Sequence, residues 1–334
     1  MLGLVAAAFC LVPNVSQAQS AGTIRATKTI ELPRDKARGV HPVVTATVIS
    51  PDGRLIATAG DDHLVRIWSQ GDGTLQQTFH GHMDWVRTLA FHPDGRTLAS
   101  AGDDRTVMFW DLSTGRAVRS VPAGNAAVYS LKYNPAGDKL AVAGFDEMIW
   151  ILDGANGNII REIASPGPDL RCLGFSPDGR LLAGAGRDGR LQIWDLPSAG
   201  QPQEFQAHHQ RVRTLAFSPD GSRLATGGDD REFVVWDVPA NQELARIPNP
   251  TGKVRAIVFC GDSRLAVGGT DNRIRIWNME SRQEELSLVG HVGSITALDY
   301  DDTQAMLVSG SFDTTVRMWQ IGRPRPNTAT RPGK

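Results

Sequence analysis

The sequence has little net charge, few cysteines and no long apolar run after its first residues. It carries 35 Lys and Arg against 36 Asp and Glu, a formal net charge of −1. This balance gives no overall field that would select nucleic acid or an acidic membrane surface. Beyond residue 18 no stretch of 18 apolar residues occurs, so no transmembrane helix is predicted. A Gly-rich phosphate loop, a nucleophile elbow and a His-Glu-x-x-His pair are also missing. The sequence therefore offers no recognisable motif that would support an enzymatic function.

What the chain has instead is a repeat. Trp-Asp or a related pair recurs at Trp68, Trp110, Trp194, Trp236, Trp277 and Trp319. The successive intervals are 42, 84, 42, 41 and 42 residues, and the midpoint of the long interval is Leu152 of Leu152-Asp153. The chain therefore contains seven units. A period of about 40–45 residues that ends in Trp-Asp is typical of a β-propeller blade of four short strands.

Two further columns repeat in register with these anchors. An aspartate stands six residues before each one: Asp62, Asp104, Asp146, Asp188, Asp230, Asp271 and Asp313. A turn resembling Ser-Pro-Asp-Gly crosses the first five units at residues 50–53, 92–95, 134–137, 176–179 and 218–221. Pro presets φ for such a turn and Gly tolerates positive φ at its end. The sixth unit shortens the turn to residues 260–262, and the seventh, residues 301–303, has neither Pro nor Gly, which predicts a different shape.

Alternating polarity and β-branched residues predict four strands in each unit. In the second unit the first three strands are residues 86–91, 97–102 and 107–110, and residues 75–79 are an example of a fourth strand. The second strands consist of small apolar residues, which suit a tight face between blades. The predicted class is therefore all-β, with four antiparallel strands per blade.

With these columns the chain resembles the WD40-repeat family over residues 24–321. The resemblance implies a seven-bladed β-propeller with a buried hydrogen-bond chain in each complete blade, made of a His, a Ser or Thr, the turn Asp and the anchoring Trp. Three units match all four positions: His82, Ser100, Asp104 and Trp110; His208, Thr226, Asp230 and Trp236; His291, Ser309, Asp313 and Trp319. Other units hold Gly124, Pro166 or Pro250 at the His position, so they are expected to be held more loosely.

The two ends of the repeat predict how the ring closes. The last unit ends at Ile321 after its third strand, and a spare strand, residues 24–32, precedes the first unit. Because a lone edge strand invites aggregation, we expect residues 24–32 to form the outer strand of the seventh blade, as is common in the family. Residues 322–334 are polar and Pro-rich, and they are expected to be a disordered tail.

The first 18 residues resemble a secretory signal. Leu2 to Val12 is mostly apolar, and Ser16-Gln17-Ala18 ends in small residues at the positions that a signal peptidase reads. No Lys or Arg precedes the apolar run, so either the true start lies upstream or the signal is atypical. The chain is expected to be exported to the periplasm or cell exterior, and otherwise to be cytoplasmic. Cys172 and Cys260 fall two blades apart, too far to form a disulfide.

Histidines and acidic pairs are the first candidates for chemistry. His80-Gly81-His82 and His208-His209 resemble chelating pairs, but His82 and His208 already have a structural role. A metal site needs three or more converging ligands, so no cofactor or metal is expected. The alternative is a propeller enzyme or metal-binding protein with its site at the central channel.

In this family the loop before the first strand and the turn before the third strand share one rim, the top face. The repeat positions that point into this opening carry different types of residue in different blades. Blades four to six carry six cations, and blades two, three and seven present aromatic residues. The candidate partner-binding residues are Trp85, Arg87, Tyr129, Phe145, Arg171, Arg187, Arg211, Arg213, Lys253, Arg255 and Phe312.

Arg and aromatic residues dominate the energy of protein interfaces, and clustered cations attract carboxylates and phosphates. The sequence therefore predicts a monomeric, non-enzymatic scaffold that binds an acidic or phosphorylated protein segment on its top face. Asp169 and Asp229 offset part of the charge. In the alternative interpretation each Arg pairs with an Asp of a neighbouring blade and the charge is only solvated. Nucleic-acid binding through the basic residues is a further rival, which export makes less attractive.

Overall fold

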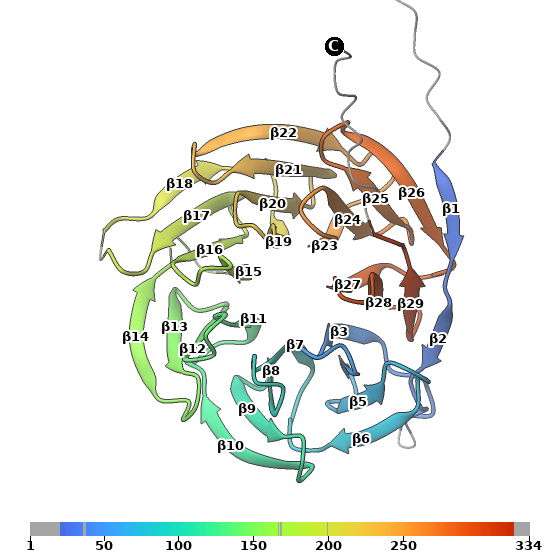
Figure 1. Cartoon of the computed structure of the whole chain (residues 1–334). Helices are drawn as coiled ribbons and strands as arrows, with labels where there is room; N and C mark the ends of the chain where they lie inside the picture. The colour runs from blue at the N-terminus through green and yellow to red at the C-terminus, as the bar shows by residue number, and fades with distance from the viewer. Residues whose placement is uncertain (1–20, 36–37, 166, 168, 199, 324–334) are drawn as a thin grey trace, which may run out of the picture.

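The computed structural model describes residues 21–35, 38–165, 167, 169–198 and 200–323. Seven sheets surround a central axis, and the described residues contain no helix (Figure 1). One strand of each sheet lies next to the axis and the others follow outward. This arrangement confirms the predicted seven-bladed β-propeller. The predicted signal segment, residues 1–18, and residues 324–334 of the predicted tail lie outside the described part of the chain.

Blades one to four follow the chain in order from the innermost to the outermost strand. Blade one contains β3 (Val44–Ile49), β4 (Leu55–Gly60), β5 (Val65–Ser69) and β6 (Leu75–Phe79). Blade two contains β7 (Val86–Phe91), β8 (Thr97–Gly102), β9 (Thr106–Asp111) and β10 (Arg116–Pro122). Blade three contains β11 (Val128–Tyr133), β12 (Lys139–Gly144), β13 (Met148–Asp153) and β14 (Ile159–Ala164). Blade four contains β15 (Leu170–Phe175), β16 (Leu181–Gly186), β17 (Arg190–Asp195) and β18 (Gln203–Gln206).

The last three blades complete the ring. Blade five contains β19 (Val212–Phe217), β20 (Arg223–Gly228), β21 (Glu232–Asp237) and β22 (Gln242–Pro248). Blade six contains β23 (Val254–Phe259), β24 (Arg264–Gly269), β25 (Ile274–Asn278) and β26 (Gln283–Val289). Blade seven contains β27 (Ile295–Asp301), β28 (Met306–Ser311) and β29 (Thr315–Gln320).

Small side chains on the second strands let neighbouring blades approach closely. Ala57 and Ala59 of β4 are fully buried and share a cluster with Val86 and Leu89 of β7 in the next blade. Similar clusters join the blades around the ring. Each contact buries apolar surface between sheets, at about 25 cal/mol per Å². The ring is therefore stabilised by interfaces between blades rather than by one central core.

The turns between first and second strands follow the sequence prediction. The glycines that end the first five turns have φ between 67° and 77°, the left-handed region that Gly adopts without steric cost: Gly53, Gly95, Gly137, Gly179 and Gly221. Gly261 serves the shortened sixth turn with φ 68°. The seventh turn has a different shape, and there the positive φ of 52° falls on Ala305.

The N-terminal segment closes the ring, but as two strands and not one. β2 (Lys28–Glu31) pairs antiparallel with β29 and forms the outer strand of blade seven. β1 (Gly22–Arg25) instead pairs parallel with β26 and adds a fifth strand to blade six. The backbone N–H of Thr27, between the two strands, donates to the carbonyl of Met318 at 2.8 Å. The predicted single strand 24–32 is therefore wrong in detail, because the segment changes partner at residues 26–27 where it crosses from blade six to blade seven.

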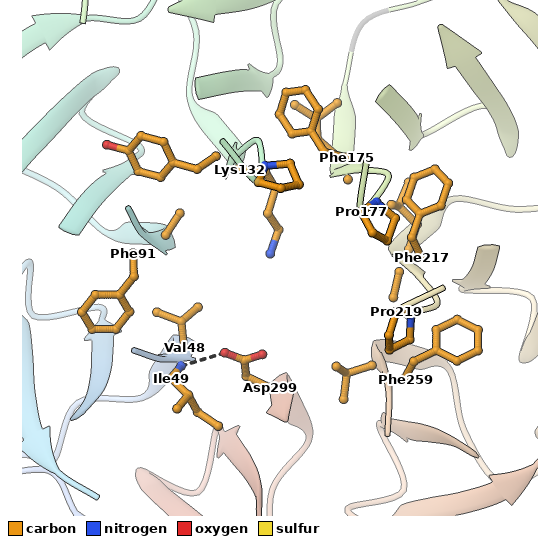
Figure 2. Close-up of a pocket in the computed structure, with 18 of the residues that line it drawn as sticks. Val48, Ile49, Phe91, Lys132, Phe175, Pro177, Phe217, Pro219, Phe259 and Asp299 are labelled. Atoms are coloured by element: carbon orange, nitrogen blue, oxygen red, sulfur yellow. Dashed lines mark hydrogen bonds between the residues drawn. The ribbon is translucent and has the colours of Figure 1, made fainter. Parts of the chain in front are cut away.

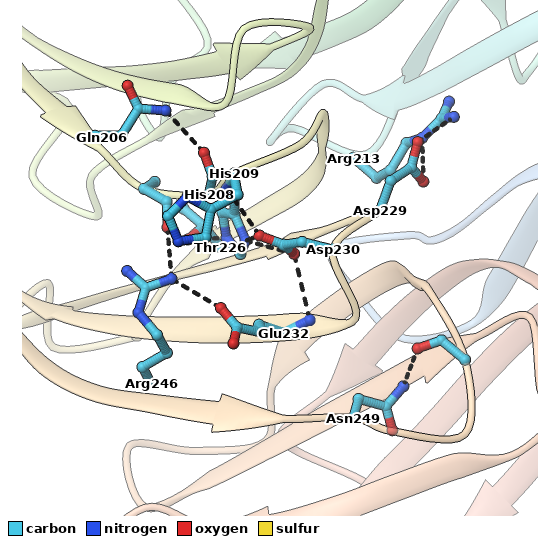
Figure 3. A network of polar contacts seen from close by, with 12 residues as sticks. Gln206, His208, His209, Arg213, Thr226, Asp229, Asp230, Glu232, Arg246 and Asn249 are labelled. Carbon is cyan, nitrogen blue, oxygen red and sulfur yellow. Dashed lines mark hydrogen bonds and ion pairs between the residues drawn. The ribbon is translucent and has the colours of Figure 1, made fainter.

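The buried chains of blades two, five and seven have the same geometry. In blade five Nδ1 of His208 lies 3.0 Å from Asp230, and Nε2 lies 2.9 Å from Thr226 (Figure 3). The indole N–H of Trp236 donates to Thr226 at 3.3 Å. The corresponding contacts in blades two and seven span 2.6–2.9 Å. Indole only donates and carboxylate only accepts, so each hydrogen-bond chain begins at the Trp N–H, passes through the hydroxyl and the His ring, and ends at the Asp carboxylate.

Two blades without the histidine use an arginine in its place. Arg66, four residues after Asp62, contacts that carboxylate at 2.6 Å with both side chains buried, and Trp68 donates to Thr58 at 2.8 Å. Arg275 contacts Asp271 at 2.6 Å in the same way. In blades three and six, however, the buried indole N–H groups of Trp150 and Trp277 have no partner among the described residues. An unpaired buried donor costs stability.

Ser309→Ala is expected to lower the free energy of unfolding by about 2 kcal/mol or more. The hydroxyl accepts from Trp319 and contacts His291, so its loss leaves two buried polar groups unpaired at about 1–3 kcal/mol each. Ser294→Ala in the same blade is the matched control, because the Ser294 side chain is half-exposed and makes no hydrogen bond with a described residue. Urea denaturation measures both. Equal midpoints for the two variants would contradict a stabilising role for the chain.

Candidate partner-binding face

The top opening of the channel is lined by one side chain from each innermost strand. Thr45, Arg87, Tyr129, Arg171, Arg213, Arg255 and Thr296, together with Phe312, surround a cavity of about 240 Å³. Seven of these residues belong to one column of the repeat, so the fold places residues about 42 positions apart side by side. The other candidate residues do not line this cavity and belong to the loops and turns around it: Trp85, Phe145, Arg187, Arg211 and Lys253.

Several of the basic side chains are paired with aspartates. Arg213 contacts Asp229 through two hydrogen bonds of 3.0 and 2.8 Å, within one blade. Burial by itself would raise the pKa of Asp229, but Arg213 and the neighbouring cations outweigh it and lower that pKa. Lys253, from the next blade, lies 4.0 Å from the same carboxylate. One aspartate therefore serves two cations.

Blades two and four repeat this pairing. Arg87 contacts Asp103 of its own blade at 3.0 and 2.6 Å. In blade four the buried Asp169, with φ 74°, contacts the guanidinium of Arg171 and also receives Arg211 of blade five at 3.2 Å. The alternative expectation, pairing across blades, therefore applies to Arg211 and Lys253, whereas Arg87, Arg171 and Arg213 pair within their own blades.

Aromatic and cationic side chains alternate across blades two to four. The guanidinium of Arg171 lies over Tyr129 at 3.8 Å and over Phe145 at 4.7 Å from the ring centres. Arg87 lies 4.4 Å from the ring centre of Trp85 and 5.5 Å from that of Tyr129. Such contacts are favourable by about 0.5–2 kcal/mol each. They hold Arg87 and Arg171 in place, so these two are less free to turn toward a ligand.

Two of the predicted cations have no carboxylate partner among the described residues. The side chains of Arg187 and Arg255 make no hydrogen bond or ion pair with any described residue. Arg187 is exposed, whereas Nε of Arg255 is buried without a hydrogen-bond partner. Burial and the neighbouring Arg213 lower the pKa of Arg255, and Asp229 opposes this shift. The guanidinium of Arg255 lies 5.8 Å from the ring centre of Phe312.

Exposed apolar side chains gather on the opposite part of the same rim. Met83 and Val292 are 83% and 81% exposed, and each directly follows the histidine of its blade. Phe145 and Phe312, in the turns before third strands, are also exposed. The sequence prediction missed Met83 and Val292, although apolar residues in a loop position are a readable signal. The rim thus has an apolar arc on blades seven, two and three and a basic arc on blades four to six.

Two further cavities of the channel lie below this opening. A middle segment of about 180 Å³ leads to a lower cavity of about 540 Å³ at the bottom face, where the turns of residues 50–53 and their equivalents lie. Within the described residues no group of three or more His, Cys, Asp or Glu side chains could hold a metal ion. The same residues include no helix long and apolar enough to cross a membrane. Cys172 and Cys260 are both free and buried.

Acid is expected to destabilise the protein by protonating the His and Asp side chains of the buried hydrogen-bond chains. Burial by itself raises the pKa of Asp313, but hydrogen bonds from His291 and Thr315 outweigh it, and the pKa lies well below its ordinary value of 3.8. This carboxylate therefore stabilises the fold above that value, and the contribution is lost as pH falls through the lowered pKa. Burial lowers the pKa of His291 from 6.5, so the unfolded chain binds a proton first and stability already declines below that pH.

Urea denaturation across this pH range tests the expectation. The free energy of unfolding should fall in two stages, one below about pH 6.5 from His291 and one below about pH 4 from Asp313 and the similarly shifted Asp104 and Asp230. Asp313→Asn should flatten the acid stage because one shifted carboxylate is gone. An unchanged acid slope in this variant would contradict the assignment.

A comparison with known proteins identifies the repeat. The family model described as WD domain, G-beta repeat matches residues 38–69, 73–111, 157–195, 200–237, 241–278 and 282–320. The stretch between the second and third matches contains most of blade three, where Leu152 replaces the anchoring Trp and Gly124 the His. Six repeats are matched, yet seven blades form, because the third unit keeps the strands and turn that build a blade.

The matches cover more than half of the chain, and the structure has the seven-bladed architecture that the repeat predicts. The chain therefore belongs to the WD40 family, whose propellers are general scaffolds for protein interaction and are typically non-enzymatic.

Proposed function

We propose that this protein is a non-enzymatic scaffold that binds an acidic or phosphorylated segment of a partner protein across its top face. The apolar arc anchors apolar side chains of the partner, and the basic arc receives its carboxylates or phosphates. Rigid presentation suffices for this task, because the residues of the opening are held by the innermost strands. Export of the chain and a monomeric state remain predictions from the sequence.

The observation that carries the proposal is the state of Arg255. Its guanidinium lies half-buried in the wall of the opening. No carboxylate of a described residue is in hydrogen-bond contact with it, and a second guanidinium, that of Arg213, is nearby. A buried charge without a partner is costly. A carboxylate or phosphate entering the opening would supply the missing acceptor, and such charge-assisted hydrogen bonds are the strong ones.

The distribution of charge supports the same conclusion. Asp169 and Asp229 each serve two cations, and Arg187 and Arg255 remain without an ion pair among the described residues. The basic arc therefore keeps an excess of positive charge even though the chain as a whole carries −1. Local positive potential of this kind speeds the approach of an acidic partner and selects against basic ones. Charge reversal at Arg255, described in the Discussion, tests the proposal.

A further inference from the structure

The lower cavity, at the face opposite the proposed docking surface, has an apolar wall. It is lined by the ends of the innermost strands and the turns that follow them, with aromatic rings such as Phe175 and Phe217 and the proline rings of Pro177 and Pro219 (Figure 2). Its volume of about 540 Å³ lies within the range of roughly 300–1,000 Å³ found for small-molecule sites. Such sites are mostly apolar and contain a few well-placed polar groups.

Two charged side chains interrupt this wall. Among the described residues that line the lower cavity, Lys132 of β11 and Asp299 of β27 are the only charged ones. They occupy the same column of the repeat in blades three and seven, where the other blades carry Val, Ala or Gly. Figure 2 shows the ammonium and the carboxylate pointing into the cavity from different sides. Both residues also line the narrower segment above, so they lie at the inner end of the lower cavity.

The two side chains do not satisfy each other. Oδ2 of Asp299 accepts the backbone N–H of Ile49 at 2.7 Å, and Oδ1 accepts that of Tyr300 at 3.0 Å. These bonds fix the carboxylate and leave further lone pairs, since each oxygen can accept two hydrogen bonds. The Lys132 ammonium makes no hydrogen bond or ion pair with any described residue, so its three donors remain available to a ligand.

Charge complementarity selects the class of ligand. An anion bound to Lys132 would also meet Asp299, and a cation bound to Asp299 would also meet Lys132. A net-neutral molecule that carries both charges avoids either repulsion and pairs each group, which a low-dielectric cavity rewards. The aromatic and proline rings would then surround an apolar body.

We propose that the lower channel binds a small apolar zwitterion, an α-amino acid with a large apolar side chain. Its carboxylate accepts from Lys132, its ammonium donates to Asp299, and its side chain packs among Phe175, Phe217 and the proline rings. This site is separate from the top face, so it stands or falls independently of the proposed scaffold function.

Calorimetric titration of the full chain tests the proposal directly. The probes are L-phenylalanine, 3-phenylpropionate, which lacks the ammonium, and 2-phenylethylamine, which lacks the carboxylate. L-Phenylalanine should bind at least about tenfold more tightly than either analogue, the loss expected when a hydrogen bond to a charged group is removed. This comparison uses the unaltered protein and does not depend on the folding of any variant.

Two substitutions then assign the charges. Lys132→Met and Asp299→Asn should each weaken L-phenylalanine binding by about tenfold or more, whereas Arg116→Gln, at an exposed position of the outermost strand β10, should leave it unchanged. Thermal melting checks that both variants are folded. No saturable binding of L-phenylalanine up to its solubility would overturn the proposal. Equal binding of 3-phenylpropionate would also overturn it, because the site would then be a simple anion site.

Discussion

Deletion of residues 23–33 is expected to lower the melting temperature by about 10 °C or more. The segment contributes Ile30, which is 4% exposed, and Leu32, which is fully buried, to the cluster that joins blades seven and one. Burying two such side chains contributes about 3–6 kcal/mol. Each kcal/mol corresponds to roughly 2–4 °C in domains of 150–250 residues. The deletion also exposes the edges of β29 and β26 and opens the ring.

Differential scanning calorimetry of the full chain and the deletion variant measures this effect. Removing only residues 22–25 is the matched control, because β1 is largely exposed and its loss should cost much less. A synthetic peptide of residues 22–33 should restore part of the lost stability when it is added to the deletion variant. An unchanged melting temperature after the longer deletion would rule out the closure mechanism.

Arg255→Glu is expected to weaken binding of an acidic segment by roughly a hundredfold and to leave the melting temperature nearly unchanged. Loss of one partner of a hydrogen-bonded, buried charge pair in an interface costs about 2–5 kcal/mol, and the introduced carboxylate adds repulsion. Stability is expected to be spared because Arg255 has no ion pair with a described residue, and because a new carboxylate would lie beside the guanidinium of Arg213.

A labelled Glu-Glu-Phe-Glu-Glu peptide, its phosphoserine counterpart and its glutamine counterpart are suitable probes in fluorescence anisotropy. Arg54→Glu is the matched control, since it changes the net charge equally but lies 83% exposed in a turn of the opposite face. Arg213→Glu is a poorer choice, because it would leave Asp229, a largely buried carboxylate, without its bidentate partner. Equal affinities for the acidic and glutamine peptides would refute the proposed function, as would Arg255→Glu binding like the unaltered chain.

Local sequence pattern predicted the fold well because each blade is built from short-range signals. Trp236 marks the third strand, Pro219 and Gly221 mark the turn, and Asp230 caps the chain of hydrogen bonds. These features act within about 40 residues. The arginines that take the place of histidine, such as Arg66 beside Asp62, were missed because they occur only where the family pattern fails.

The candidate face was predicted less completely. Register alone brought Arg87, Arg171 and Arg213 to one opening. It did not distinguish Arg255, which has no ion pair among the described residues, from Arg213, which is held by Asp229. Nor did it find Lys132 and Asp299, because the two are exceptions in non-adjacent blades of an otherwise apolar column, and their shared cavity is seen only in the structure.

The sequence by itself determined the number of blades, their strands and turns and the column that faces the channel. Residues that recur at the same position of each repeat specify the same local structure in every blade. Only the tertiary structure decided that residues 22–31 divide between blades six and seven, which cations keep a free hydrogen-bond donor, and which charges meet across the channel. Those outcomes depend on contacts between residues hundreds of positions apart, such as Lys28 and Met318. Their geometry arises when the ring closes, and no single repeat encodes it.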